Sequence, residues 1–580
     1  MKCSLYTSDA MKGSLRPLVA GLLACVVLTH LFVPLASASA YNGRPKLIVI
    51  VVIDQFRGDY LERYRDQFGE GGFRLFLDRG AYFTDCYYDY ANTRTAPGHA
   101  TLITGAYSSG HGIMANEWWD PQKKRTVTSV EDDATRLVGI PGEPKGASPH
   151  NLLSSTLGDE LKLATGGKSR VFGVALKDRA AILPAGHAGD AAYWIDHQTG
   201  AWVTSTYYRS ELPKWAADFN SGNRASKYWD REWRDGSGNT LGSTAHRKGK
   251  EGDAGFYEVV GSTPFANDYE FEFAKELVLY EQLGTGPTTD LLIISLSAND
   301  ILGHQAGPDA PEMQAMSLAI DRELSEFFVF LGHQVGLANV WIALSADHGV
   351  SPLPGVAGKL RLPAAGLDAS SVGAQINKTL TAKFGAARTT EFIKSFDYPN
   401  AFLNEDAFSS LKIKEEDAER AVGEAMKQAG LRGYFTRSQL AQGTVPDTEM
   451  GRRYLHSYSP AGGWYVLGVP APFVVGGLKG TDHATPYSYD THVPLAFYGL
   501  PFQLGAFRTH AEPVDLAVTL ASLLGINVPT HAIGRVLTEA LAPAHRAENS
   551  NPPAEKSPRP TRNKGELQPA AMMSSDGGQQ

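Results

Sequence analysis

Short apolar runs alternate with amphipathic segments along most of the chain. Apolar runs of about four to eight residues are typical of strands buried on both faces of a sheet, and a period near 3.6 is typical of a helix on its surface. The runs that we predict to be strands are Lys46–Ile53, Arg170–Leu176, Asp290–Leu296, Val340–Ser345, Phe473–Gly476 and Val493–Tyr498. Their alternation with helical patterns predicts an α/β fold with a largely parallel central sheet flanked by helices.

The clearest helical patterns are Asn151–Ala164, Pro311–Leu331 and Pro513–Leu524. The last begins with a proline and ends before Gly525, which is the order expected of a helix. Two stretches break the alternation. Residues 181–267 are rich in Gly, Trp, Tyr and Arg, and residues 352–465 have a helical pattern of their own at Glu415–Ala429. We interpret both stretches as inserted cap segments.

These breaks predict how the chain is divided. With 580 residues and 43% hydrophobic content, the chain is large enough for more than one core. The predicted parts are a signal peptide (1–40), a first part of the catalytic core (41–180), an insertion (181–267), a second part of the core (268–351), a cap insertion (352–465), a third part of the core (466–541) and a disordered tail (542–580), which is rich in Pro, Ser, Gly and Gln.

The first 40 residues have the composition of a secretory signal peptide. Basic residues precede the apolar run Leu18–Leu35, and the small residues Ala36–Ala40 follow it. We therefore expect cleavage after Ala40 and a periplasmic or secreted protein. Two alternatives stay open: the apolar run could remain as a membrane anchor, or Leu22–Cys25 could be a lipoprotein cleavage box.

The cysteine content argues against an internal disulfide, and the charge argues against a nucleic-acid partner. Cys3 and Cys25 lie in the leader, so the mature chain keeps only Cys86 and has no internal disulfide. The net charge of -8 and the pI near 6.1 provide no basic stripe that would follow a nucleic-acid backbone. We expect a monomer that acts on small molecules, with no nucleic-acid partner and no membrane contact apart from the N-terminal anchor alternative.

The segment Asn92–Ala100 places hydroxyl groups beside a predicted helix start. Pro97 suits the first turn of a helix, so Thr95 would lie at its N-terminus. Upstream, Asp54 ends the first predicted strand, which is a usual place for a metal ligand in an open α/β sheet. The succession of strand, acid and hydroxyl predicts a metallohydrolase.

Three further clusters of Asp and His follow predicted strands or lie in loops. They are Asp300 with His304, Asp347 with His348, and Asp482 with His483. Asp300 and His304 are four residues apart, so one helical turn puts both on the same side. Mixed imidazole and carboxylate ligands suit zinc, although such sites also accept manganese, cobalt or iron. The clusters predict a site for two divalent cations.

Together these pieces resemble the alkaline phosphatase superfamily, and within it the type I phosphodiesterase/nucleotide pyrophosphatase branch that includes the threonine-nucleophile alkaline phosphatases. The resemblance spans most of Lys46–Leu541 and rests on Asp54, Thr95–His99, Asn116, Asp300 with His304, Asp347–Gly349 and His483. It implies an alkaline-phosphatase-like fold, a phospho-threonine intermediate on Thr95 and two Zn²⁺ ions. One ion would be bound by Asp300, His304 and His483, and the other by Asp54, Asp347, His348 and the Thr95 hydroxyl.

Lys177 and Arg179 indicate the class of substrate. Side chains two residues apart in an extended segment project to the same side, so this pair would bind one phosphate. A monoester dianion suits an ammonium and a planar guanidinium. The resemblance implies that the pair, together with the amide of Asn116 on a phosphate oxygen, marks monoesterases. We therefore expect a zinc-dependent phosphomonoesterase.

Three other functions are compatible with parts of this pattern. A phosphodiesterase or nucleotide pyrophosphatase of the same superfamily shares the metals and the nucleophile, and the insertions could add a pocket for a second ester group. A sulfatase needs a Cys or Ser in a Cys-x-Pro-x-Arg type motif, which the segment around Thr95 does not match. A catalytically dead scaffold that only binds phosphate ligands is disfavoured because every ligand position is filled. We interpret His99 and His111 as structural, and His492 is the rival to His483 as the last zinc ligand.

Overall fold

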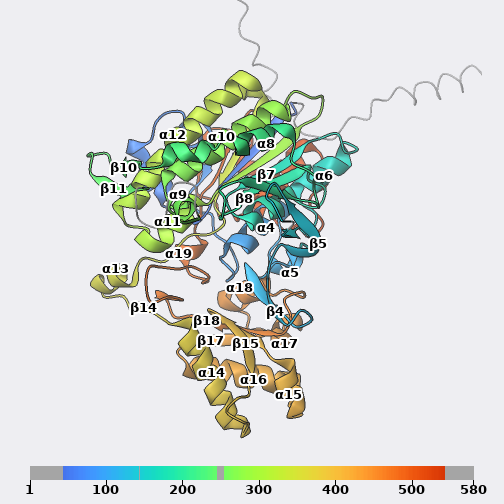
Figure 1. Cartoon of the computed structure of the whole chain (residues 1–580), viewed down its shortest axis with the longest axis vertical. Coiled ribbons are helices and arrows are strands. Elements are labelled where there is room, and N and C mark those ends of the chain that lie inside the picture. The colour runs from blue at the N-terminus through green and yellow to red at the C-terminus, as the bar shows by residue number, and fades with distance from the viewer. Residues whose placement is uncertain (1–42, 143, 245–253, 543–580) are drawn as a thin grey trace, which may run out of the picture. The chain divides into compact units, whose positions relative to one another are not determined.

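A mixed sheet of eleven strands forms the centre of the molecule in the computed structural model (Figure 1). The structure describes residues 43–142, 144–244 and 254–542, so the predicted signal peptide and almost all of the predicted tail lie outside the described residues. The strand order is β21-β2-β20-β13-β1-β12-β7-β8-β9-β5-β6. No helix within the described ranges combines the length and the apolar content needed to cross a membrane.

The middle of this sheet is parallel, as predicted. β1 (Leu47–Ile53) pairs in parallel with β12 (Asp290–Leu296) and with β13 (Val340–Ser345). β7 (Val171–Ala175) and β8 (Ala191–Ile195) continue the parallel arrangement beyond β12. Every residue of these five strands is buried, which explains why they read as unbroken apolar runs.

Antiparallel pairs extend the sheet on both sides. β20 (Leu495–Tyr498) pairs antiparallel with β13 and with β2 (Ala81–Phe83), and β21 (Gly505–Phe507), which pairs in parallel with β2, ends that side. The other side continues through three strands in antiparallel pairs: β9 (Trp202–Ser205), β5 (Glu131–Val138) and β6 (Lys145–Ala147). β8 and β9 fall within residues 181–267, so part of that predicted insertion contributes strands to the central sheet.

One predicted strand of the sheet was wrong. Within Phe473–Gly476 only Val474–Val475 is extended, as β19, and it pairs with β14 (Ala365–Gly366) outside the large sheet. The neighbouring prolines Pro470 and Pro472 remove backbone donors that a central strand would need. A short apolar run therefore does not by itself show that a segment belongs to the central sheet.

Helices cover both faces of the sheet, because its crossovers run in opposite directions. α7 (Asp178–Ala185) connects β7 to β8, whereas α11 (Ala298–Ala306) and α12 (Pro311–Gln334) connect β12 to β13 across β1. Right-handed crossovers in opposite directions place their helices on opposite faces. α10 (Pro264–Tyr280) packs on α12, and α4 (Thr95–Thr104) packs on α7.

The predicted helices are present, with corrected boundaries. α12 ends at Gln334 rather than Leu331, and α20 (Asp515–Leu524) begins two residues after the predicted Pro513 and ends before Gly525, which is in the left-handed conformation. α6 (Leu157–Ala164) starts later than predicted, because Thr156 forms a capping box with Asp159. The shorter elements of the sheet-bearing part are α2 (Tyr60–Arg63), α3 (Phe73–Arg79), α5 (Ser108–His111), β3 (Glu117–Asp120), β4 (Arg125–Thr128), α8 (Lys214–Ser221), β10 (Glu232–Arg234), β11 (Thr240–Ser243), α9 (Ala254–Gly261) and α19 (Ser488–Thr491).

Residues 352–465 contain a second, smaller core. An antiparallel sheet of β15 (Ile393–Asp397), β16 (Asn400–Leu403), β18 (Tyr465–Val469) and β17 (Gly433–Thr436) packs against α14 (Ala369–Phe384) and α16 (Glu415–Gln428). α16 matches the helix predicted at Glu415–Ala429. The remaining helices are α13 (Pro354–Lys359), α15 (Glu405–Ser410), α17 (Arg437–Ala441) and α18 (Glu449–Ser457). In Figure 1 the small sheet lies below the large one.

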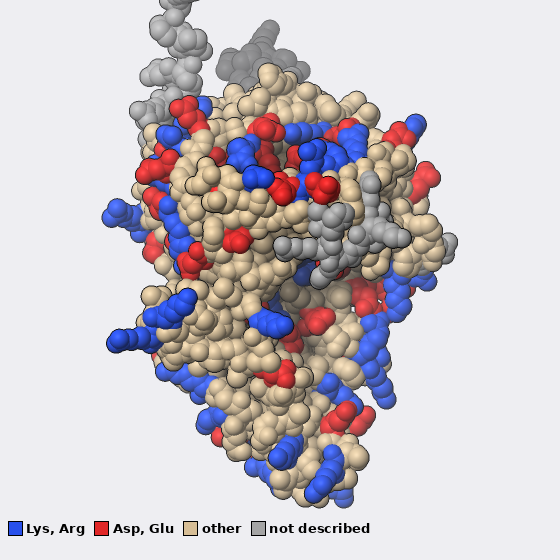
Figure 2. All heavy atoms as spheres, turned by 60° about the vertical axis from the view of Figure 1, so that its left-hand side comes forward, with Lys and Arg blue, Asp and Glu red and all other residues tan. Residues whose placement is uncertain are grey.

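Surface charge has no single sign on the face that Figure 2 shows. Lysine and arginine side chains are interspersed there with aspartate and glutamate side chains over both the upper and the lower part. This face therefore presents neither a continuous basic stripe nor a continuous acidic one.

Candidate metal centre and nucleophile

The candidate site lies where the parallel strands of the sheet end. Asp54 directly follows β1, Asp347 follows β13 after one residue, and Lys177 follows β7 after one residue. Asp300 lies in the first turn of α11, just after β12. Because the carboxyl ends of neighbouring parallel strands meet at one edge, four distant chain segments place their side chains together.

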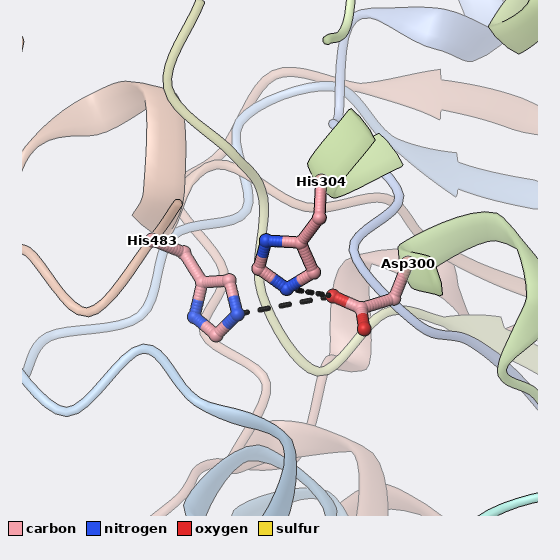
Figure 3. Close-up of side chains that lie close together, drawn as sticks. All are labelled: Asp300, His304 and His483. Carbon is pink, nitrogen blue, oxygen red and sulfur yellow. Dashed lines mark ion pairs between the residues drawn. The ribbon is translucent and has the colours of Figure 1, made fainter. Parts of the chain in front are cut away.

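Asp300, His304 and His483 form the first cluster, and Figure 3 shows both imidazoles turned toward the carboxylate. His304 Nε2 lies 3.2 Å from Asp300 Oδ1, and His483 Nε2 lies 3.8 Å from it. The other ring nitrogens donate to backbone carbonyls: His304 Nδ1 to Thr481 at 2.8 Å, and His483 Nδ1 to Thr93 at 2.6 Å. These bonds hold both Nε2 atoms facing the carboxylate, which is the orientation of metal-binding imidazoles.

A second cluster surrounds His348. Its Nδ1 donates to the carbonyl of Gly349, and its Nε2 lies 3.5 Å from Asp54 Oδ1 and 3.5 Å from Asp347 Oδ2. These three facing atoms are buried, and none has a hydrogen-bond partner among the described residues. Ligand atoms of Asp54, Asp300 and His348 also lie within 4.8 Å of one another. Buried acceptors facing one another are costly without a cation, so the donor set fits a divalent metal.

The pKa shifts reflect burial and crowding of charge. Burial raises the pKa of Asp54, and repulsion from Asp300 and Asp347 raises it further. Burial acts in the same direction on Asp300, but the charges of His304 and Lys177 hold its pKa well below its usual range. Burial lowers the pKa of His348 and His483, so both are neutral imidazoles with a free lone pair. Burial lowers the pKa of His304, but the charge of Asp300 outweighs it and raises that pKa to about 10, so a cation bound at this Nε2 would take the place of a proton.

Thr95 is the first residue of α4 and is 1% exposed. The positive end of the helix lies at its hydroxyl, which favours negative charge there. Asn116 Oδ1 accepts from the Ala96 backbone N–H at 2.8 Å, so the Asn116 amide nitrogen is left to bind another group beside the helix start. Gly98 allows α4 to pack here, because a Cβ at this position would lie 2.2 Å from the Asp347 carbonyl oxygen.

Lys177 and Arg179 do not lie together in an extended segment, contrary to the prediction. The backbone of Lys177 is extended, but α7 begins at Asp178, so Arg179 lies on the first helical turn. The rule that side chains two residues apart in a strand project to the same side therefore does not apply to this pair. Lys177 Nζ lies 2.6 Å from Asp54 Oδ2 and 2.6 Å from Asp300 Oδ2, inside the cluster. Arg179 pairs with Asp178 at 3.5 Å, and a quarter of its side chain is exposed.

The remaining histidines have structural contacts. His99 Nδ1 donates to the Thr95 carbonyl at 2.8 Å, and Nε2 lies 2.6 Å from Ser295 Oγ, which ties α4 to β12. His111 is buried and accepts from the Ile113 backbone N–H. His492 donates to the Thr84 carbonyl at 3.1 Å and stacks on Tyr87. This position favours His483 over His492 as a ligand.

Two residues that hold the ligands in place had no predicted role, although Asn299 adjoins Asp300 in the first predicted cluster. Gln55 Nε2 donates to Asp300 Oδ1 at 2.6 Å, and its backbone N–H donates to Asp347 Oδ1 at 3.0 Å. Asn299 Nδ2 donates to the Asp54 carbonyl at 2.7 Å. Each of these residues adjoins a ligand in the sequence, and that adjacency was the only available signal.

Comparisons with known proteins identify the family of this chain. Residues 48–363 match the family described as type I phosphodiesterase / nucleotide pyrophosphatase. The alkaline phosphatase PafA of Elizabethkingia meningoseptica is 33% identical over 86% of this chain and 95% of its own. The alkaline phosphatase PhoV of Synechococcus elongatus is 32% identical over 90% of this chain and 99% of its own. A Myroides odoratus protein named a calcium-transporting ATPase is 32% identical over 87% and 96%.

Solved structures show the same fold. The crystal structure of wild-type PafA has a TM-score of 0.78 and 32% identity, and the match covers 87% of this chain and 100% of that one. A second PafA structure carries substitutions at one threonine, one asparagine, one lysine and one arginine.

Proposed function

Because the chain belongs to the type I phosphodiesterase / nucleotide pyrophosphatase family, we propose that it is an exported, zinc-dependent alkaline phosphatase that hydrolyses small phosphate monoesters. The observation that carries the proposal is the pair of buried Asp/His clusters beside Thr95, at the carboxyl ends of four parallel strands. The names of two long relatives, PafA and PhoV, support the activity.

Two Zn²⁺ ions would be held by the residues of the two clusters. Asp300, His304 and His483 would bind one, and Asp54, Asp347 and His348 would bind the other together with the Thr95 hydroxyl. When bound, the ions would favour the ionised Thr95 hydroxyl and neutralise charge on the departing oxygen. The three unpartnered buried atoms around His348 support this assignment.

Thr95 acts as the nucleophile in this proposal. Its hydroxyl gives its proton to water, its Oγ1 attacks phosphorus, and the bond from phosphorus to the ester oxygen breaks; the departing oxygen takes up a proton from water, so the alcohol leaves. Water then attacks the phosphorus of phospho-Thr95, inorganic phosphate leaves, and the hydroxyl is restored. Each in-line displacement inverts the phosphorus, so the two together retain its configuration. The helix N-terminus at Thr95 supports the role by stabilising negative charge.

Asn116, Lys177 and Arg179 would bind the phosphate oxygens. The Asn116 amide nitrogen is available, because its oxygen is already bonded to Ala96. Lys177 lies among the cluster carboxylates, and Arg179 is two residues further along. The four residue types substituted in the PafA variant are those of Thr95, Asn116, Lys177 and Arg179. Three cationic or amide donors on one phosphate suit a dianionic monoester.

Two other activities use the same site. A phosphodiesterase needs space for a second ester group, and the name of the Myroides relative suggests hydrolysis of ATP as another candidate activity.

We also propose that the protein is exported from the cytoplasm, because the composition of the leader favours a periplasmic or secreted protein. A monomeric state completes the proposal.

The test is a comparison of kcat/KM for p-nitrophenyl phosphate, bis-p-nitrophenyl phosphate and ATP, with the zinc-loaded mature protein under one set of conditions. We expect the monoester to be preferred over the diester by about a hundredfold or more. Replacing Lys177 and Arg179 with alanine should reduce monoester hydrolysis far more than diester hydrolysis. A preference for the diester would instead identify a phosphodiesterase, and a preference for ATP would identify a nucleotide hydrolase.

A further inference from the structure

An apolar cavity lies among the ends of β7 and β8 and the helices α9, α10 and α11. It measures about 220 Å³ and is lined by residues from several elements, including Leu176, Ile195, Val260, Ala266 and Ile301. By the same measure one water needs roughly 10–15 Å³, so the cavity has room for a group of several carbon atoms.

The walls of the cavity adjoin the residues that would bind phosphate. Leu176 directly precedes Lys177, and Ile301 directly follows Asp300, while Lys177 Nζ and Asp300 Oδ2 are 2.6 Å apart. His197 also lines the cavity, and burial lowers the pKa of its imidazole, while the charges of Asp178 and Asp196 act in the opposite direction. The cavity therefore shares α11 and the β7–α7 junction with the proposed site.

The volume and lining select the kind of group that would fit. Apolar side chains dominate the wall, so a polar or charged group would lose its hydration without replacement hydrogen bonds. Drug-sized ligands use pockets of roughly 300–1,000 Å³, which is larger than this one. A benzene ring or a short alkyl chain fits these limits better than a complete nucleoside.

We propose that this cavity receives the alcohol portion of the substrate, and that the enzyme prefers phosphate monoesters of aryl or short alkyl alcohols. This inference rests on the proposed phosphatase function. Ester groups that extend from a phosphate bound by Lys177 and Arg179 would reach the cavity past Leu176 and Ile301. Burial of each added methylene would raise kcat/KM about fourfold until the cavity is full.

Gly261 offers a direct way to fill the cavity. It is the last residue of α9 and lines the cavity, and a Cβ built on it meets only Ile301 Cδ1, at 3.9 Å. Gly332 is a matched control, because it lies in α12, is not among the cavity residues, and its Cβ would meet nothing within 4 Å. The two variants Gly261→Phe and Gly332→Phe add the same side chain to a helix.

The experiment measures kcat/KM of the full zinc-loaded chain for methyl, ethyl, propyl and butyl phosphate, whose leaving groups differ little in reactivity. We expect a steady rise along the series in the wild-type protein and in Gly332→Phe. In Gly261→Phe the ratio of butyl to methyl should fall to near one. A flat series in the wild type, or an unchanged ratio in a folded Gly261→Phe protein, would overturn the inference.

A binding measurement separates this inference from the proposed function. Calorimetric titration with butylphosphonate and methylphosphonate requires no turnover. Tighter binding of butylphosphonate to wild type, lost in Gly261→Phe, would support the cavity even if no ester were hydrolysed. Equal affinity of the two phosphonates would overturn the cavity assignment, while hydrolysis of methyl phosphate would still support the phosphatase.

Discussion

At the scale of single residues, Thr95 is the group on which the proposed mechanism depends. It is the first residue of α4, next to Ala96, whose backbone N–H donates to Asn116, and its carbonyl oxygen accepts a hydrogen bond from His99 Nδ1. We expect Thr95→Ala to lower kcat by about 10³-fold or more, because no other hydroxyl would replace the attacking oxygen. Zinc content, measured by elemental analysis, should stay largely intact because the Asp and His ligands remain. Turnover near the wild-type rate would falsify Thr95 as the nucleophile.

Asn116 allows its two roles to be separated. Its oxygen accepts from the Ala96 backbone N–H, while its amide nitrogen would donate to the substrate. Asn116→Asp keeps the acceptor but removes the donor, so kcat/KM should fall by about 10²–10³-fold with little change in the unfolding midpoint. Asn116→Ala should lose activity and also stability. If Asn116→Asp retains its activity, the amide nitrogen does not bind the transferred phosphate.

His111 should make stability depend on pH. Burial lowers its pKa to about 3, against about 6.5 in an unfolded chain. The unfolded state therefore binds more protons below pH 6.5, so the contribution of neutral His111 is complete above pH 6.5 and is lost as the pH falls toward 3. Its Nδ1 accepts from Ile113 N–H, a bond that protonation breaks.

Urea unfolding of the metal-free, chelated protein between pH 7 and pH 5 tests whether His111 causes this pH dependence. The free energy of unfolding should fall by up to about 1.4 kcal/mol per pH unit more in wild type than in His111→Asn. Chelation beforehand removes the separate effect of metal loss. Equal slopes for the two proteins would show that His111 is not the titrating group.

At the scale of elements, the start of α4 is tied to the small sheet. Arg94, the residue before Thr95, is buried, and its guanidinium contacts Asp397 Oδ2 at 2.7 Å and the Tyr398 carbonyl at 2.6 Å. The carbonyl of Thr93 accepts from His483. Residues 93–95 thus connect β15, a proposed zinc ligand and the proposed nucleophile, so the smaller core would help to position the catalytic loop.

Asp397→Ala should therefore affect catalysis as well as stability. It leaves the buried Arg94 with one partner fewer, which should lower the free energy of unfolding by about 1–2 kcal/mol. We also expect kcat to fall by about tenfold at temperatures well below unfolding, because a small displacement of Thr95 is costly in an in-line reaction. The control is Asp417→Ala, which breaks an exposed pair with Arg420 in α16. Equal kcat in Asp397→Ala and the control would limit this ion pair to stability.

The same elements show where prediction from sequence succeeded and failed. Strands such as β1 and β12 were predicted because burial on both faces makes them uniformly apolar. The start of α7 at Asp178 was missed, since Lys177-Asp178-Arg179 is compatible with either a strand end or a helix start. Helix caps set by side chains, such as that of Thr156, shift boundaries without changing the apolar pattern.

At the scale of the whole molecule, the proposed ligand residues could be recognised from the sequence, but the long-range contacts that position them could not. Asp54, Asp300 and Asp347 each follow an apolar strand, so their meeting at one sheet edge follows from the parallel order. The contact between Thr93 and His483 joins residues 390 positions apart and depends on the packing of two loops. No local pattern encodes such a contact, and the pairing of α4 with the smaller sheet is unpredictable for the same reason.

Metal removal should destabilise the entire fold, because the clusters join strands from distant parts of the chain. Ligand binding stabilises a protein by RT ln(1 + [L]/Kd), about 4 kcal/mol for each site at a metal concentration of 1,000 Kd. Chelation should therefore lower the unfolding midpoint by several degrees, and added zinc should restore it. The measurement is differential scanning calorimetry before and after chelation.

Asp300 is the variant that distinguishes metal binding from general loosening, because its carboxylate lies within 4.8 Å of ligand atoms of His304 and His483 and also of Asp54 and His348. Asp300→Asn should reduce zinc content, melt near the temperature of the chelated wild type and respond little to further chelation. Asp482→Asn is its control: Asp482 Oδ1 is 3.9 Å from His483 Nε2, but Asp482 belongs to neither cluster. It should keep its zinc and its response to chelation. If both variants kept the wild-type response, the clusters would not be where the stabilising metal binds.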